Sequence, residues 1–196
     1  MYSSKITPYG PYVTVDPITA DCVWSVLDRV GVDVFGSQHT KMTPYRLAHY
    51  LEYWYRPPDD VRFTVFDNED PVIDQMVTVD PIPFWACCSH HMLPFFGQVY
   101  FGYLPGDKII GLSQIQMQVQ SFCARPWLQE TMVKELADVL EELSNPQGLG
   151  LIVRATHTCQ MLDLGPIVPN MTFSELRGCF REHHAVRDEF WKLAGI

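Results

Sequence analysis

Two short segments of the sequence combine cysteine and histidine at spacings that suit a metal ion. The segment CCSHH offers Cys88 and His91, three residues apart, and the segment ATHTC offers His157 and Cys159, two residues apart. If the second segment is a strand, its residues i and i+2 share one face, so both side chains can point into one site. Catalytic zinc sites commonly combine three thiolate, imidazole or carboxylate ligands with one water. The two clusters therefore predict a single shared ion.

Each cluster is a weak signal when it is taken alone. A buried thiol beside a core histidine is a common structural arrangement, because cysteine is among the most buried residue types. The presence of two compact clusters shifts the balance toward a metal site. The clusters also hold more candidate groups than three ligands require. The remaining histidines are then available for proton transfer, a role that suits an imidazole near neutral pH.

The composition narrows the classes of protein to which the chain can belong. Its 196 residues are 47% hydrophobic, enough for one sizeable core, and its formal net charge is −9. An acidic chain argues against a nucleic-acid partner, since phosphate binding needs a basic face. We find neither a signal peptide nor an apolar run of the roughly 20 residues that a membrane helix needs. We therefore expect a cytoplasmic protein that has no membrane partner and whose six cysteines stay reduced.

The N-terminal part of the chain is expected to be helical. We expect helices over 18–32 and 43–55, after an extended arm over 1–17 and before an acidic loop or irregular strand over 59–74. The second helix begins with Thr43 as a candidate N-cap and with Pro44, a combination typical of helix starts. We expect one domain over 18–196, with a helical part over 18–74 and a core over 75–196.

The rest of the chain mixes strand and helix patterns. We expect a strand with a proline kink over 75–88, a hairpin over 97–113, a helix over 113–124 and an amphipathic helix over 127–144. The spacing of apolar residues over 113–124 also fits a strand. One bent strand or two strands are expected over 148–165, and helices over 172–180 and 184–194. This order of elements is typical of an α+β fold with antiparallel pairing.

Five blocks of the sequence resemble the GTP cyclohydrolase I family. The segment CCSHHMLPFFGQVYFGYLPGDKIIGLSQ is similar to the family pattern C-E-H-H-x-x-P-F-x-G, followed by x-G-Y-(I/L)-P and G-L-S-K. ATHTC matches A-T-H-x-C, RPWLQET resembles R-x-Q-x-Q-E-R, and TPYRLAHY resembles T-P-x-R-x-A-K. The segment from Met171 onward resembles the C-terminal helices of the family. The blocks follow the family order from about residue 18 to the end of the chain.

The resemblance implies a tunnelling fold, in which two helices back an antiparallel sheet and the chains assemble into a ring-shaped homo-oligomer, usually a decamer. Active sites would then lie between subunits. It further implies Zn2+ as the cofactor and a guanine-type nucleotide or nucleoside as the small-molecule partner. The implied site residues are the metal ligands Cys88, His91 and Cys159, the proton-transfer residues His90 and His157, and the substrate contacts Gln129, Glu130, Ser113 and Arg46. Cys87 is then an additional core thiol.

The implied reaction is hydrolysis of the purine imidazole ring at C8. Water does not attack this carbon atom without a catalyst. Zinc lowers the pKa of a bound water toward about 7, while an acid protonates the ring nitrogen. Ring opening, loss of formate and reclosure to a dihydroneopterin-type product follow. A carboxylate such as Glu130 can accept from both N1–H and the 2-amino group of guanine. Without the resemblance, a solvated Gln-Glu pair on an amphipathic helix is the favoured interpretation of Gln129 and Glu130.

The sequence departs from the family pattern at the positions that would meet a triphosphate. Gln114, Met117, Asp163 and His49 stand where the family has lysine or arginine, whereas Arg46 is retained. A hydrogen bond to a charged group is worth roughly 1.5–3 kcal/mol. The loss of three would cost on the order of 4–9 kcal/mol, about a thousandfold or more in binding. Compensating cations could come from a neighbouring subunit or from Lys108, Arg125 and Arg154.

These departures predict a divergent homologue. It would keep zinc-assisted hydrolysis at C8 but bind a triphosphate weakly, so its substrate would be less phosphorylated or modified. Two alternatives remain open: an ordinary GTP cyclohydrolase I making 7,8-dihydroneopterin triphosphate, and a non-catalytic, ring-forming binding homologue. The complete set of zinc ligands and histidines argues against the second alternative. Ser89, which replaces the usual glutamate of C-E-H-H, favours none of them.

Overall fold

The computed structural model describes residues 15–55, 64–69 and 72–195. The chain divides into two compact units, Met1–Arg56 and Pro57–Ile196. The expected arm over 1–17 lies almost wholly outside the described residues. The helices that the structure describes are all too short or too polar to cross a membrane.

Two helices, α1 (Pro17–Arg29) and α2 (Thr43–Tyr55), make up the described part of the smaller unit, as expected from the spacing of apolar residues. Asp16 caps α1, because its side chain accepts a hydrogen bond from the backbone N–H of Ile18 (3.0 Å). The helix ends earlier than expected, just before Gly31, whose φ of 80° lies in the left-handed region. The two helices bury a small shared core, formed by Ala20, Val23 and Ala48.

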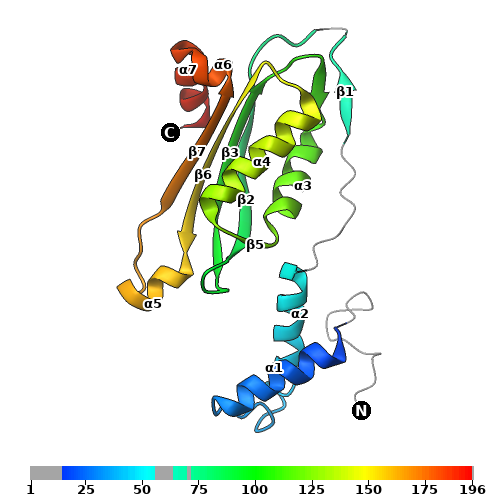
Figure 1. Cartoon of the computed structure of the whole chain (residues 1–196), viewed down its shortest axis with the longest axis vertical. Coiled ribbons are helices and arrows are strands. Elements are labelled where there is room, and N and C mark those ends of the chain that lie inside the picture. Colours follow the sequence, from blue (N-terminus) through cyan, green and yellow to red (C-terminus); the bar gives the residue numbers. More distant parts are fainter. Residues whose placement is uncertain (1–14, 56–63, 70–71, 196) are drawn as a thin grey trace. The chain divides into compact units, whose positions relative to one another are not determined.

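A five-stranded sheet is the centre of the larger unit (Figure 1). Its strands are β2 (Val77–Cys88), β3 (Pro94–Leu104), β5 (Pro126–Trp127), β6 (Gly148–His157) and β7 (Met171–Gly178). They lie in the order β5-β2-β3-β6-β7, and every neighbouring pair is antiparallel except β2 and β5. The expected proline kink in β2 is a register shift between Val79 and Ile82. A second, small sheet pairs β1 (Val65–Asp67) with β4 (Lys108–Ile110).

Helices α3 (Leu112–Cys123) and α4 (Gln129–Ser144) lie side by side against one face of this sheet (Figure 1). Successive side chains of a strand point to opposite faces, so alternate residues of β3 share the helix-covered face. These are Phe95, Val99, Phe101 and Tyr103, all essentially buried. Helix α4 contributes a matching apolar stripe of Met132, Val133, Leu136 and Leu140. The main core therefore lies between the sheet and these two helices, which gives the α+β architecture expected from the sequence.

The C-terminal helices α6 (Cys179–Glu182) and α7 (His184–Ala194) cover part of the other face of the sheet. Phe180 and Phe190 pack there against Tyr100 and Ile152. The strands come close to these rings because Gly150 has no side chain; a Cβ at this position would lie 2.7 Å from the ring of Phe190.

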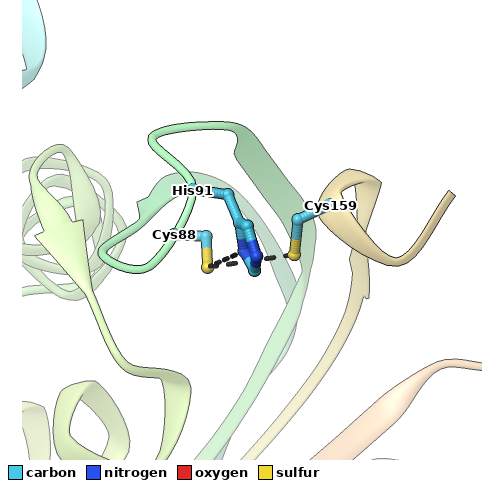
Figure 2. Close-up of side chains that lie close together, drawn as sticks. All are labelled: Cys88, His91 and Cys159. Carbon is cyan, nitrogen blue, oxygen red and sulfur yellow. Dashed lines mark hydrogen bonds between the residues drawn. The ribbon is translucent and has the colours of Figure 1, made fainter. Parts of the chain in front are cut away.

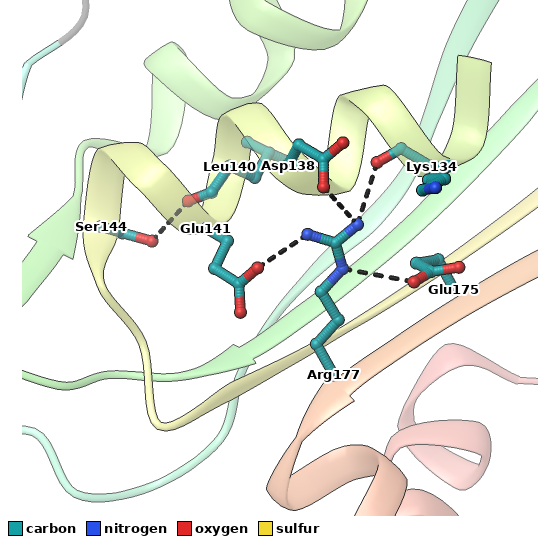
Figure 3. Close-up of polar contacts among 7 residues, drawn as sticks. All are labelled: Lys134, Asp138, Leu140, Glu141, Ser144, Glu175 and Arg177. Atoms are coloured by element: carbon teal, nitrogen blue, oxygen red, sulfur yellow. Dashed lines mark hydrogen bonds and ion pairs between the residues drawn. The ribbon is translucent and has the colours of Figure 1, made fainter. Parts of the chain in front are cut away.

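Arg177 links strand β7 to α4 through ion pairs and hydrogen bonds (Figure 3). Its guanidinium lies 2.7 Å from both Asp138 and Glu141, and it donates to the carbonyl of Lys134 (3.1 Å). Glu175, two residues away on the same strand, is the third acidic partner, at 3.3 Å. Burial lowers the pKa of Arg177, but hydrogen bonds and charge from Glu141 and Asp138 outweigh burial and raise it.

The prediction of a helix over 172–180 is wrong. Most of this segment is β7, which pairs with β6 from Met171, opposite Ala155, to Gly178, opposite Gly148. The residues of the segment have enough apolar character for either structure. The unpaired edge of β6 decides between them, because its backbone groups need partners.

The hairpin expected over 97–113 does not form either. Strand β4 follows the turn but pairs with β1, since β3 is already hydrogen-bonded to β2 on one side and β6 on the other. The segment that fitted both helix and strand is α3, whose buried Ile115, Val119 and Phe122 recur at helical spacing. Residues 148–165 hold one strand, β6, followed by a 3-10 turn (Thr158–Gln160) and the short helix α5 (Met161–Leu164).

Candidate metal centre and active site

The topology of the sheet brings the two cysteine and histidine segments together. Strands β2 and β6 flank β3 on its two sides and both run antiparallel to it. Their C-terminal ends therefore lie at the same end of the sheet, β2 at Cys88 and β6 at His157. The 3-10 turn that follows β6 then carries Cys159 back toward the end of β2.

Cys88, His91 and Cys159 form a compact group (Figure 2). The Sγ atoms of the two cysteines lie 3.8 Å apart, and Cys88 Sγ lies 3.9 Å from His91 Nδ1. A tight turn brings the histidine back over the strand end: Met92, at a φ of 57°, donates its N–H to the carbonyl of Cys88 (2.8 Å). All potential ligand atoms of the group lie within 4.8 Å of one another.

This group fits a zinc ion. Two sulfur atoms bound about 2.3 Å from one tetrahedral zinc lie about 3.8 Å apart, which is the separation found here. Two thiolates and one imidazole also match the preference of zinc for sulfur and nitrogen ligands, and three protein ligands leave a fourth position free. Both cysteines are buried, whereas His91 is exposed. Burial, followed by the hydrogen bond and charge of Cys88, raises the pKa of the Cys159 thiol.

His157 is fixed next to this group by two contacts. Its Nε2 lies 2.8 Å from Oε1 of Gln129, the first residue of α4. Its ring stacks on Phe95, the residue opposite it on β3, with ring centroids 4.5 Å apart and an angle of 3° between the planes. Burial lowers the pKa of His157, and the negative charge of Glu130 opposes this shift.

Gln129 and Glu130 differ in their surroundings although they are adjacent. Gln129 is 2% exposed, and its Nε2 donates to the carbonyl oxygens of Val153 (3.1 Å) and Met171 (3.2 Å). Glu130 is exposed in the first turn of α4, near enough to His157 to influence its pKa. His90 is also exposed, with its ring centroid 6.0 Å from that of His91.

The structure does not bring Ser113 to this end of the sheet. Ser113 is exposed at the start of α3, immediately after β4, and Ile110 of β4 is hydrogen-bonded to Tyr103. Tyr103 lies eight residues along β3 from Phe95, a distance of about 27 Å. Gln114 follows Ser113 and is therefore also remote from the cysteines of its own chain. Arg46 belongs to the smaller unit, where its guanidinium donates to the carbonyl of His39 (3.3 Å).

Sequence reasoning assigned no role to Phe95, although it holds the ring of His157. The only signal was its place in the P-F of the family-like motif, which does not distinguish a core residue from one that supports a site. Arg125, a candidate phosphate-binding cation, is engaged elsewhere: its guanidinium stacks over Phe122 and Trp127, and its Nε donates to the carbonyl of Phe122 (3.2 Å).

The chain matches one known protein family over most of its length. The family profile described as GTP cyclohydrolase I matches residues 19–195. The chain belongs to the GTP cyclohydrolase I family. Its membership makes it a hydrolase of the class that acts on cyclic amidines, as the resemblance in the sequence implied.

Three relatives, all named GTP cyclohydrolase 1, illustrate the extent of the similarity. The one from Aquifex aeolicus is 38% identical over 171 residues, which cover 85% of this chain and 90% of the relative. The one from Wolinella succinogenes is 36% identical over 178 residues (87% and 92%). The one from Chlorobaculum tepidum is 35% identical over 182 residues (89% and 79%). A solved structure of the archaeosine synthase QueF-Like in the apo form covers 53% of this chain and 93% of its own, with 16% identity and a TM-score of 0.45.

Proposed function

We propose that this member of the GTP cyclohydrolase I family opens the imidazole ring of a guanine nucleotide at C8, with release of formate. The observation that carries the proposal is the convergence of Cys88 and Cys159, at 3.8 Å, beside His91, with His157 held next to them by Gln129. The relatives named GTP cyclohydrolase 1 support the choice of a guanine nucleotide as substrate.

Cys88, His91 and Cys159 are the residues that would hold zinc. Zinc, when bound, supplies Lewis-acid activation of water at neutral pH. The protein itself moves the protons: His157 and His90 lie at the same strand ends, where an imidazole can pass a proton to the ring nitrogen and take one up again. Glu130 is exposed at this edge, where its carboxylate can accept from N1–H and the 2-amino group of guanine.

We also propose that the phosphate chain is held weakly. Asp163 lies exposed in α5, four residues beyond Cys159, where a negative charge repels phosphate. Arg125, at the same end of the sheet, already stacks on two aromatic rings. The substrate is then a guanine nucleotide with fewer phosphates, a nucleoside or a modified base, and the product is of the dihydroneopterin type.

The remoteness of Ser113 supports assembly. Ser113 follows β4, which is hydrogen-bonded to Tyr103, whereas the cysteine group lies near Phe95, about 27 Å away along β3. We infer that one chain does not bring both ends of the substrate-binding set together. A second copy of the chain would supply the missing end. We therefore propose a ring-shaped homo-oligomer, such as a decamer, with active sites between subunits, working in the cytoplasm.

Steady-state kinetics with the zinc-loaded protein test the proposal. Release of formate and pterin fluorescence would be followed for GTP, GDP, GMP and guanosine. We expect turnover in which kcat/KM for GTP does not exceed that for GMP or guanosine. A strong preference for GTP would instead identify the ordinary enzyme that makes 7,8-dihydroneopterin triphosphate, an alternative favoured by the names of the relatives. Absence of turnover with every guanine compound would favour a non-catalytic homologue.

A further inference from the structure

We propose that Gln129 is a positioning residue, which accepts a hydrogen bond from Nε2–H of His157 and so holds the imidazole in one tautomer and one orientation. This inference rests on the proposed function only in the catalytic role given to His157. The assignment of Gln129 itself comes from its hydrogen bonds.

The orientation of the Gln129 amide is determined by its partners. Its Nε2 lies 3.1 Å from the carbonyl oxygen of Val153 and 3.2 Å from that of Met171. Carbonyl oxygens only accept, so both amide protons are used there. The opposite orientation would place the amide oxygen against two carbonyl oxygens in a buried position, where unpaired polar atoms are costly. The amide nitrogen therefore faces the strands, and Oε1 faces His157.

The orientation of the amide in turn determines the tautomer of the histidine. Oε1 of Gln129 can only accept, and it lies 2.8 Å from Nε2 of His157. Nε2 must therefore carry the proton. In a neutral imidazole the other nitrogen, Nδ1, then has the lone pair.

The plane of the imidazole is fixed as well. It stacks on Phe95 with an angle of 3° between the rings. Phe95 is fully buried and packs in turn against Phe84 in a T-shaped arrangement, with ring centroids 6.0 Å apart and 79° between the planes. Rotation of the imidazole out of this plane would break both the stacking contact and the hydrogen bond to Gln129. The ring is thus held in position before a substrate arrives, which is what a proton-transferring group requires.

The same contacts divide the Gln-Glu pair into two roles. The amide of Gln129 uses both donors and one acceptor lone pair within the protein, and the side chain is buried, which leaves little of it accessible to guanine. Glu130, the next residue along the helix, is exposed. We therefore assign Gln129 to the support of His157 and leave the recognition of guanine to Glu130.

The tautomer can be measured without any turnover. In protein labelled with 15N-histidine, NMR correlation of ring nitrogens with ring protons reports which nitrogen is protonated, and loss of signals in His157→Gln assigns them. We expect a single tautomer protonated on Nε2 in the unsubstituted protein, with and without zinc. A proton on Nδ1 would overturn the proposal. Since this readout needs no substrate, it stands or falls separately from the proposed reaction.

Two variants test the effect on catalysis. Gln129→Met keeps the size of the side chain but removes the acceptor, so we expect a mixture of tautomers and a kcat lower by about tenfold or more, with little change in KM. Glu130→Gln should show the reverse pattern, with an unchanged tautomer and a raised KM. Gln147→Met is the matched control, because Gln147 makes a comparable amide-to-carbonyl bond to Pro105 (2.9 Å) at the other end of the sheet. An unaltered tautomer in Gln129→Met, or an equal loss of kcat in Gln147→Met, would refute the positioning role.

Discussion

Cys88 and Cys159 are separated by 71 residues in the sequence, yet their Sγ atoms lie 3.8 Å apart. Strand β3 is the reason, because it pairs with β2 on one side and with β6 on the other and aligns the ends of both strands. Cys87 is equally buried but lies one position earlier on β2, outside the group of potential ligands. These two adjacent thiols allow a direct test of the metal site.

Cys88→Ala is expected to abolish zinc binding, because a site with one thiol and one imidazole lacks the ligands for a stable tetrahedral shell. Cys87→Ala, which removes the neighbouring buried thiol, is the matched control and should bind zinc normally. Metal content per chain after dialysis, measured by elemental analysis, distinguishes the two variants. Zinc retained in Cys88→Ala, or lost in Cys87→Ala, would show that the ligands have been assigned wrongly.

The affinity for zinc should depend on pH. Burial and the proximity of Cys88 raise the pKa of Cys159, so near neutral pH this thiol holds a proton that the metal must displace. The apparent affinity is therefore expected to rise with pH as long as the pH stays below the pKa of the thiol. Competition with a chromogenic chelator between about pH 6 and about pH 8, together with the protons released on binding, measures this dependence. An affinity that is flat across this interval would mean that the thiols are already ionised in the zinc-free protein.

Arg177 is expected to stabilise the fold rather than the site. Arg177→Met leaves Asp138 and Glu141 without their shared partner and removes the link between β7 and α4. Because the carboxylates are partly exposed, we expect a loss of about 1–3 kcal/mol in the free energy of unfolding. Urea denaturation measures it. Arg181→Met, at an exposed position in α6, serves as the control and should change stability by less than about 0.5 kcal/mol.

The weak binding of the triphosphate can be reversed if its proposed cause is correct. Asp163→Arg replaces a repelling charge with an attracting one, so we expect KM for GTP to fall by about tenfold or more while KM for guanosine stays unchanged. Glu189→Arg makes the same change of charge at an exposed position of α7 and should affect neither constant. An equal change for GTP and guanosine in Asp163→Arg would separate the effect from phosphate binding.

The sequence indicated the elements of the fold more reliably than their pairing. The spacing of apolar residues in α1, α2 and α4 predicted helices that the structure contains, and α4 buries a continuous stripe of its own residues. The same spacing wrongly predicted a helix where β7 forms. The sequence also suggested a hairpin between β3 and β4, whereas β4 pairs with β1. The identity of a strand's partner is not encoded in the strand, since any free edge offers the same backbone groups.

What the sequence determined by itself was the chemistry available to this protein. The cysteine and histidine segments, in their family-like order, predicted the three residues that the structure brings together and the reaction class. Only the tertiary structure decided which of these residues are buried and where they lie. Gln129 is buried and bonded to His157, whereas its neighbour Glu130 is exposed. Ser113 lies toward the other end of the sheet. Residue types record which groups are present, whereas burial and direction arise only when the helices pack on the sheet, because packing determines which side of each backbone is removed from water.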